Sequence, residues 1–437
     1  MVGSTATSVD DGFTMVAVGD LIVSRPLTNG GHPGFERIVE LLRDADATLG
    51  NLETSIFDSR NFEGSPQAEF GGAYHASVPA LGADLKAMGF KILSFANNHT
   101  FDWGVEGMRE TCEALDRNDI VHAGAGKSLA QAAAARFLET PRGRVGLVSC
   151  ATTFTPQSRA ADPAPSAAGR PGINALRLTR NVVVTTEMLE QVKLIRDALP
   201  DYKVSQDDPQ KAILAEITFR AGDVPGFTYE PNQKDLTNIL WNVRRGKQYS
   251  DFCILANHGH EPGNWSQQPA DYEQTFARAA IDAGADAYVA HGPHQLRGIE
   301  IYKDRPIFYS LANFMVDDLR TPMGVDMFET YGKDPRTYTD ADVTVAEMTS
   351  GYDTAPGFSD PVFYESLITA STYEGSRLKE VRLYPVELGH SKRMARRGIP
   401  SLASPEQSES ILARTQALSC PFGTEIEILG NVGLIKL

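Results

Sequence analysis

The chain has little cysteine, and its cysteines have no spacing typical of a disulfide framework. Among 437 residues only Cys112, Cys150, Cys253 and Cys420 occur, with no close pair and no CxxC motif. Cys150 and Cys253 lie in short apolar segments, where we expect buried free thiols. The sequence therefore argues against a disulfide scaffold and against a cysteine-based zinc site.

An excess of positive charge is also absent. The 41 Lys and Arg residues face 56 Asp and Glu residues, and the formal net charge is −15. Phosphate backbones bind to basic surfaces, so we expect no nucleic-acid partner. No apolar segment is long enough to span a bilayer, and residues 1–11 have neither a basic nor an apolar signal segment. We therefore expect a cytoplasmic protein with no membrane partner.

What the sequence does contain is an alternation of short apolar segments and amphipathic segments, in a composition that is 42% hydrophobic and 22% charged. This alternation predicts an α/β fold. The predicted strands span residues 13–20, 48–53, 90–95, 145–150, 252–256, 287–290 and 307–311, and the predicted helices span residues 35–45, 79–88, 107–118 and 272–283.

The remaining segments predict additions to this core. Residues 155–172 are rich in Pro, Ala and Ser and indicate a long loop, and residues 186–245 show helical patches with polar breaks. Residues 363–370 and 378–385 alternate like antiparallel strands that extend a sheet of the same domain. We expect one domain over residues 13–390 with an insertion around 155–250. Residues 391–437 would be a C-terminal extension packed on that domain.

Polar residues gather where the predicted strands end. The residues concerned are Asp20, Glu53, Asn98, His99, Asp102, His258, His260, His291 and His294. In α/β proteins ligands bind at the carboxyl ends of strands. Residues 97–102 alone fit a turn equally well, but polar residues at five strand ends favour a metal or acid–base site. By contrast, His32, His75, His122 and His390 lack this setting, and we expect them to be ordinary surface or packing residues.

These motifs resemble the CapA family, which is named for poly-γ-glutamate capsule synthesis and belongs to the calcineurin-like metallophosphoesterase superfamily. The resemblance covers roughly residues 13–320. It rests on Gly19-Asp20, Asn51-Leu52-Glu53, Asn97-Asn98-His99, His258-Gly259-His260-Glu261, His291-Gly292-Pro293-His294 and the segment from Tyr309 to Phe314. It implies a calcineurin-like β-sandwich flanked by helices, an αββα arrangement with a metal site at the strand ends.

The chain departs from the superfamily pattern in the first half of that site. Ile22 stands where the superfamily has a histidine, and Glu53 stands in place of its bridging aspartate. The resemblance therefore implies one divalent metal ion instead of two, held by Glu53, Asn98, His258 and His291. Ca²⁺, Mg²⁺, Mn²⁺ and Zn²⁺ all remain open, with Ca²⁺ favoured by the resemblance, and no pyridoxal phosphate is expected.

The remaining polar residues form two His/Asp pairs, Asp20 with His294 and His99 with Asp102, which we expect to be catalytic. One branch of the family resembles a peptide epimerase that inverts the C-terminal residue, a tryptophan, of a lasso-peptide precursor. We accordingly predict a metal-dependent epimerase acting on a precursor peptide. The alternative is a metal-dependent hydrolase, a phosphoesterase or γ-glutamyl peptidase, related to poly-γ-glutamate synthesis. The net charge disfavours a third possibility, a non-enzymatic module that binds an acidic polymer.

Four further residues are candidates for the site, each with an ordinary alternative. His260 lies at the same strand end as His258. Arg170 and Arg297 suit binding of a peptide carboxylate, but surface salt bridges explain them equally well. Trp103 fits either a pocket for an aromatic side chain or the core.

Overall fold

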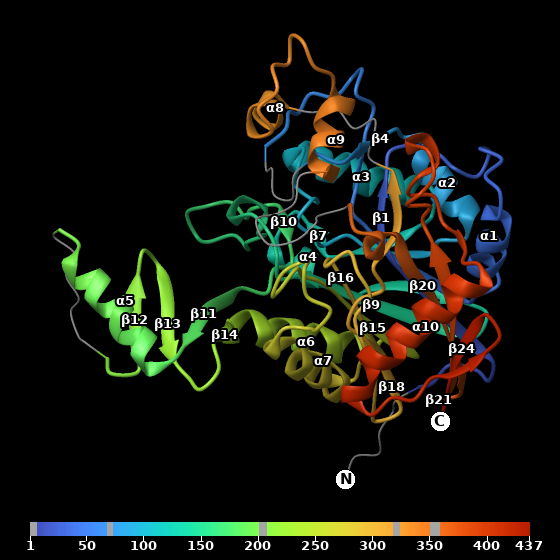
Figure 1. Ribbon diagram of the computed structural model, residues 1–437. Coiled ribbons are helices and arrows are strands. Elements are labelled where there is room, and N and C mark those ends of the chain that lie inside the picture. Colours follow the sequence, from blue (N-terminus) through green and yellow to red (C-terminus); the bar gives the residue numbers. More distant parts are fainter. Residues whose placement is uncertain (1–6, 68–72, 201–207, 318–323, 350–358) are drawn as a thin grey trace.

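Two β-sheets pack face to face, with helices on both outer faces (Figure 1). The structure is a computed structural model that describes residues 7–67, 73–200, 208–317, 324–349 and 359–437. The first sheet has the order β23-β24-β21-β20-β1-β2-β5-β6, with β19 beside β1 and β22 beside β21. Its strands are β1 (Phe13–Val23), β2 (Ala47–Leu52), β5 (Ile92–Ser94), β6 (Val121–Ala123), β19 (Asn313–Asp317), β20 (Glu365–Glu374), β21 (Arg377–Glu387), β22 (Ser401–Leu402), β23 (Glu427–Leu429) and β24 (Val432–Lys436).

The second sheet has six strands in the order β17-β18-β16-β15-β9-β8. They are β8 (Arg136–Thr140), β9 (Gly143–Ala151), β15 (Phe252–His258), β16 (Ala287–His291), β17 (Ile299–Tyr302) and β18 (Arg305–Phe308). Strands β9, β15, β16 and β18 run parallel to one another. Their carboxyl ends therefore lie along one edge of the sheet.

The core between the sheets follows from the alternation of side chains along β1. Met15 and Ala17 belong to the cluster between the sheets, whereas Val16 and Val18 belong to the cluster under the helices. Successive strand residues point to opposite faces, so a strand buried on both sides is apolar throughout. The rings of Phe13 and Phe252, one from each sheet, lie 5.1 Å apart.

Helices cover both outer faces and complete the αββα arrangement, which confirms the expected fold class. On the first sheet lie α1 (Phe35–Arg43), α2 (Ala80–Met88) and α3 (Gly104–Arg117), and on the second lie α6 (Gln233–Gln248) and α7 (Asp271–Ala283). The C-terminal helix α10 (Pro405–Ser419) begins at a capping box formed by Ser404 and Gln407 and contacts β21. In the parts of the chain described, no helix is long and apolar enough to cross a membrane.

A small sheet with one helix projects from this body (Figure 1). We call residues 178–231 the arm. It contains β11 (Leu178–Val184), α5 (Thr186–Ala198), β12 (Lys211–Leu214), β13 (Ile217–Ala221) and β14 (Gly226–Pro231), with the sheet order β12-β13-β11-β14. The prediction of helical patches over residues 186–245 is therefore wrong for the strands β12, β13 and β14. Most residues of these strands are half-buried or exposed, so their sequence lacks a regular apolar alternation.

The C-terminal third extends the first sheet, as expected. Strand β20 pairs antiparallel with β1, and β21 pairs with β20 and with β24. The division of the chain into one domain and a C-terminal extension stays a prediction. Short elements connect the larger ones: α4 (Leu129–Ala133), α8 (Val325–Thr330), α9 (Asp340–Thr349), β3 (Ser55–Ile56), β4 (Ala76–Ser77), β7 (Ala125–Gly126) and β10 (Gly172–Ile173).

Candidate metal centre

The ends of parallel strands from both sheets bring the predicted polar residues together. Asp20 on β1 lies in register with Asn51 on β2, and His258 on β15 lies in register with His291 on β16. Gly19 allows β1 to approach the neighbouring turn, since a Cβ atom there would lie 1.8 Å from the carbonyl oxygen of Ala312. This close approach is what only glycine permits.

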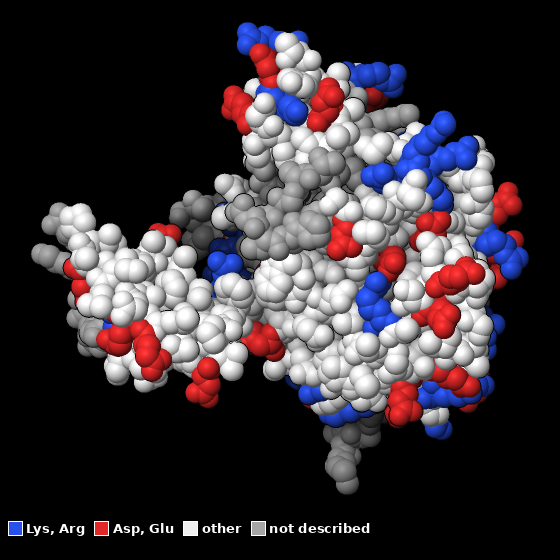
Figure 2. Space-filling model, in the orientation of Figure 1, with Lys and Arg blue, Asp and Glu red and all other residues white. Residues whose placement is uncertain are grey.

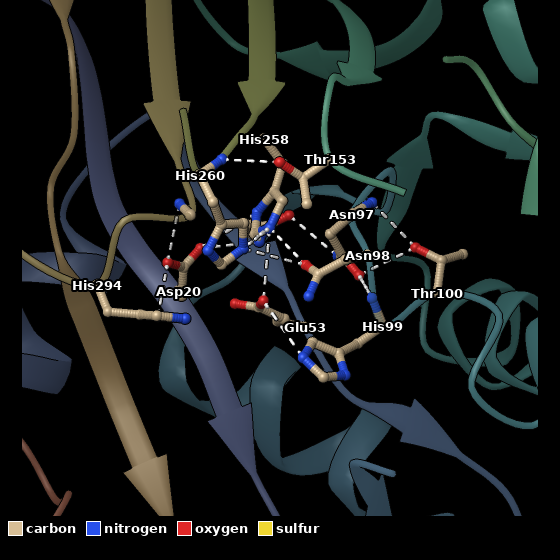
Figure 3. Close-up of polar contacts among 12 residues, drawn as sticks. Asp20, Glu53, Asn97, Asn98, His99, Thr100, Thr153, His258, His260 and His294 are labelled. Atoms are coloured by element: carbon tan, nitrogen blue, oxygen red, sulfur yellow. Dashed lines mark hydrogen bonds and ion pairs between the residues drawn. The ribbon is translucent and has the colours of Figure 1, made fainter. Parts of the chain in front are cut away.

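Four side chains converge around one point, and we call them the four-residue cluster: Glu53, Asn98, His258 and His260 (Figure 3). The Nε2 atom of His258 lies 2.7 Å from Asn98 Oδ1, 3.1 Å from His260 Nε2 and 3.5 Å from Glu53 Oε1. Ligand atoms that share one cation at about 2.1 Å are spaced by about 3 Å. The spacing in this cluster therefore fits a single cation.

Glu53 provides the strongest sign that a cation belongs here. It is fully buried, and neither carboxylate oxygen accepts a hydrogen bond from the described residues. Burial, followed by the negative charges of Asp20 and Asp102, raises the pKa of Glu53 well above its usual value. An unpaired buried carboxylate is costly, and a cation would offset that cost. The residues present therefore fit a bound metal ion.

The ring of His260 is oriented so that it could bind the same cation. Its Nδ1 atom lies 2.7 Å from Asn264 Oδ1, an acceptor, so Nδ1 carries the proton. This leaves the Nε2 lone pair directed at the cluster, as in metal-ligating histidines whose other nitrogen donates to an oxygen. The backbone N–H of His260 also donates to Thr153 Oγ1 at 2.9 Å.

His99 and Asp102 form a buried dyad beside the cluster. The distance between His99 Nδ1 and Asp102 Oδ2 is 2.7 Å, and His99 Nε2 lies 3.9 Å from Glu53 Oε1. Burial lowers the pKa of His99 to about 3, so the ring is neutral near pH 7. With Nδ1–H donating to Asp102, the Nε2 lone pair faces Glu53 and is available to take a proton.

On the other side of Glu53, the protein's own hydrogen bonds hold Asp20 and His294. Asp20 accepts from Asn51 Nδ2 at 2.8 Å and from the Gly292 N–H at 3.2 Å. The Nδ1 atom of His294 lies 2.8 Å from Asn313 Oδ1 but 3.7 Å from Asp20 Oδ2. The Nδ1 atom of His294 therefore lies within hydrogen-bond distance of Asn313 and within ion-pair distance of Asp20, and a catalytic role for the Asp20 and His294 pair stays a prediction.

Asp20, Glu53 and His294 nevertheless form a second group whose ligand atoms lie within 4.8 Å of one another. Burial raises the pKa of Asp20 to about 7. Ile22, two residues along β1, is a buried apolar side chain and adds no ligand to this group.

The structure places His291 beside the four-residue cluster and not within it. Its Nε2 atom lies 3.1 Å from the carbonyl oxygen of Val18, so Nε2–H is the donor. Its Nδ1 atom is buried and has no hydrogen-bond partner among the described residues. His260 therefore offers a nitrogen to the four-residue cluster, and the role of His291 as a metal ligand stays a prediction.

The three other candidates lie outside the cluster. Arg297 is buried, and it donates to the carbonyl oxygen of Ser266 at 3.2 Å and to Glu273 at 3.4 Å. Arg170 is exposed and donates to the carbonyl oxygen of Arg159 at 2.7 Å. Neither arginine contacts the residues of the cluster.

Trp103 packs within an aromatic group and not against an open pocket. Its ring lies 4.9 Å from Phe57, 5.9 Å from Phe62 and 6.0 Å from Tyr74. Met327 and Phe328 of α8 complete this group. The structure therefore favours a packing role for Trp103 in the core over a role in lining a pocket for an aromatic side chain.

Comparison with known proteins agrees with this geometry. Residues 14–318 match the family described as bacterial capsule synthesis protein PGA_cap. The chain belongs to this family. It is 64% identical over 439 residues to the uncharacterised protein y4sH of Sinorhizobium fredii, covering all of this chain and 95% of that protein.

More distant CapA relatives carry a functional name. The PGA biosynthesis protein CapA of Bacillus subtilis is 27% identical over 71% of this chain and 65% of its own length. The capsule biosynthesis protein CapA of Bacillus anthracis is 24% identical over 70% of this chain and 60% of its own length. These two relatives are named for capsule or PGA biosynthesis, and no relative described here is named as an epimerase.

The CapA-family site also contains residues to which sequence reasoning gave no role. Asn51 Nδ2 links the two sides, at 2.8 Å from Asp20 Oδ1 and 3.1 Å from His258 Nδ1. The ring of His75, expected to be ordinary, lies 4.2 Å from that of His99, and the backbone N–H of His75 donates to Asp102 Oδ2. Asn51 and Asn313 lie within the motifs that mark the family, and this position in the sequence could have indicated a role at the site. His75 follows no predicted strand, so nothing in the sequence indicates that it lies there.

Proposed function

We propose that this chain is a metal-dependent hydrolase that cleaves γ-glutamyl amide bonds. The observation that carries the proposal is the His99–Asp102 dyad, whose Nε2 atom faces Glu53 at the edge of the four-residue cluster. The names of the Bacillus relatives support the substrate class. The group around Asp20 lacks the histidine that Ile22 replaces, which disfavours a two-metal phosphoesterase.

The four-residue cluster offers two imidazole nitrogens, one carboxylate and one amide oxygen. This donor set suits Mn²⁺ or Zn²⁺ better than Ca²⁺, which prefers oxygen ligands alone. A divalent cation held there would activate a water molecule and polarise the amide carbonyl.

The dyad then supplies the proton transfers. His99 is neutral near pH 7 because burial lowers its pKa, and Asp102 fixes its tautomer through Nδ1. Nε2 takes a proton from the attacking water as its oxygen bonds to the carbonyl carbon. The same atom returns the proton to the leaving nitrogen as the C–N bond breaks, so water is consumed and no other reactant is needed.

A peptide epimerase is the second candidate, and one observation favours it. His99 and His294 lie on opposite sides of Glu53 (Figure 3). Two such bases would remove the Cα proton from one face and return a proton to the other. A lasso-peptide precursor ending in tryptophan would be the substrate.

One experiment separates the two reactions. The metal-loaded protein is incubated in D₂O with tri-γ-glutamate and, separately, with a peptide ending in tryptophan. Hydrolysis releases free amine and leaves Cα–H intact, whereas epimerisation introduces deuterium at Cα without new amine. The His99→Asn variant should lower the rate of the active reaction about 100-fold or more, and His390→Asn, outside the cluster, should not.

Amine release from tri-γ-glutamate that depends on His99 supports the hydrolase. Deuterium incorporation without amine release would replace it with the epimerase. If the metal-loaded protein produces neither change, the proposed function fails.

A further inference from the structure

A pocket separate from the four-residue cluster lies where the arm joins the body. Its volume is about 380 Å³, and three basic residues line it: Arg159, Arg177 and Lys234. The rest of the wall consists of Leu129, residues 160–162, Asn174, Ala175 and two residues of α6, Asp235 and Asn238. Figure 2 shows Lys and Arg side chains in the hollow between the arm and the body. We call this the arm-base pocket.

Both carboxylates of the arm-base pocket are already engaged. Asp235 accepts two hydrogen bonds from Arg177, at 2.7 Å to Nε and 2.8 Å to Nη2. Asp162 accepts from the backbone N–H of Ala130 at 2.7 Å. Neither carboxylate pairs with Arg159 or Lys234.

Arg159 and Lys234 are the unpaired cations of the pocket. Neither side chain has a hydrogen-bond or ion-pair partner among the described residues. Burial, and then the charges of Arg177 and Arg170, lower the pKa of Arg159, and the charge of Asp235 opposes this shift. Lys234 lies in the first turn of the 16-residue helix α6, whose N-terminus adds partial positive charge. An anion is the ligand that this arrangement accepts.

The strand register places this pocket near the four-residue cluster. His258 on β15 is level with Ala151 on β9, and Ala151 in turn bridges to Ala175 in the pocket wall. Neighbouring strands lie about 4.8 Å apart, so the backbone of Ala175, one residue of the wall, is about 10 Å from the backbone of His258. An extended γ-glutamyl residue spans about 6 Å. Two such residues therefore cover the distance between the backbones of Ala175 and His258.

We propose that the arm-base pocket binds a side carboxylate of an acidic peptide chain whose reacting amide lies at the four-residue cluster. This assignment rests on the proposed function, because the cluster must hold the same chain. Arg159 and Lys234 bind the carboxylate, and Arg177 shapes the pocket through Asp235. The local positive charge selects an acidic substrate although the whole chain carries a net charge of −15.

Binding without turnover tests the assignment. A fluorescent tetra-γ-glutamate is titrated into metal-loaded His99→Asn protein and followed by anisotropy. Adding Arg159→Gln and Lys234→Gln should weaken binding about tenfold or more, since two charge-assisted contacts are lost. The matched control carries Arg244→Gln and Arg245→Gln on α6, which remove the same total charge from the chain but line no part of the pocket. The control should bind as its parent does.

Two further probes identify the ligand chemistry. A tetra-γ-isoglutamine probe, in which each side carboxylate is replaced by an uncharged amide, should bind weakly to every variant. Inorganic phosphate should displace tetra-γ-glutamate only at much higher concentration. If phosphate binds tightly and tetra-γ-glutamate does not, the pocket is a phosphate site and the proposal is overturned.

The outcomes also separate this assignment from the proposed function. Binding that depends on Arg159 and Lys234, together with no amine release by the metal-loaded wild-type protein, supports the pocket and rejects the hydrolase. Amine release with binding that is indifferent to both residues supports the hydrolase and overturns the pocket.

Discussion

The two sides of the candidate site use similar residues in different ways. On one side, Glu53 is buried and neither of its oxygens accepts a hydrogen bond from the described residues. On the other side, Asp20 accepts from Asn51 and Gly292, and Asn313 holds His294. Both carboxylates are fully buried. The difference lies in their partners and not in their exposure.

This difference indicates which side needs a cation. The hydrogen bonds of Asp20 compensate part of the cost of burying its charge. Glu53 has no such compensation, and its pKa is raised further by the negative charges of Asp20 and Asp102. A single ion held by the four-residue cluster, which includes Glu53, would therefore stabilise the whole site, including the side of Asp20.

The largest expected effect comes from Glu53→Gln, which keeps the shape of the side chain and removes its charge. We expect metal content to fall from about one ion per chain to nearly none, with activity lowered about 1,000-fold. Elemental analysis of the purified variant and amine release measure the two changes. The metal-free variant should unfold no earlier than the metal-free parent, because it buries no unpaired carboxylate. A variant that retains its metal contradicts the proposed cluster.

His99→Asn should separate catalysis from metal binding. The Nε2 atom of His99 lies 3.9 Å from Glu53 Oε1, and His99 belongs to neither group of candidate metal ligands among the described residues. We expect activity to fall about 100-fold or more while metal content stays unchanged. Loss of the metal together with activity would make His99 a ligand and remove its role as the base.

Acidification should destabilise the metal-free protein. Burial lowers the pKa of His99 to about 3 and those of His260 and His291 to about 4, below the unfolded value of 6.5. The unfolded chain therefore binds more protons, so this stability is present above pH 6.5 and lost as the pH falls. Each such histidine contributes on the order of 2 kcal/mol between pH 7 and pH 5.

The carboxylates oppose this trend, because the pKa of Asp20 is raised to about 7 and that of Glu53 is also raised. They favour the folded state as the pH falls, but the buried histidines outnumber them. Urea unfolding midpoints measured at pH 7, 6 and 5 with a chelator present should therefore decrease. Saturating Mn²⁺ should steepen the decrease, since protons compete with the cation for His258 and His260. Midpoints that rise on acidification would show that the carboxylates dominate.

The strand ends were predictable, whereas the convergence of particular histidines was not. Apolar segments followed by Asp20, Glu53, Asn98 and His258 mark strand ends in the sequence, and parallel pairing brings such ends together. Whether His260 or His291 turns toward the cluster depends on backbone conformation after each strand. Gly292 has φ of +117°, and the ring of His291 is held by Val18 from the opposite sheet. Contacts between sheets leave no local pattern in the sequence.

The strands of the arm could not be predicted from the sequence either. In β11 only Asn181 is fully buried, so a polar residue occupies the position where an apolar one is expected. Its strands pair across separations of tens of residues, as between Leu178 and Pro231. The alternation that predicts the strands of the body is a product of burial, and the arm buries too little for that signal to appear.

The smallest expected effect comes from Asp20→Asn, which makes on one side of the site the same chemical change that Glu53→Gln makes on the other. The amide can accept from Asn51 or from Gly292 with its one oxygen, so about one hydrogen bond is lost, worth roughly 1 kcal/mol. We expect metal content to remain near one ion per chain and activity to fall about tenfold or less. Both variants are measured side by side by elemental analysis and amine release. If Asp20→Asn loses the metal as completely as Glu53→Gln, Asp20 is itself a ligand, and the two sides form one shared metal site despite the isoleucine at position 22.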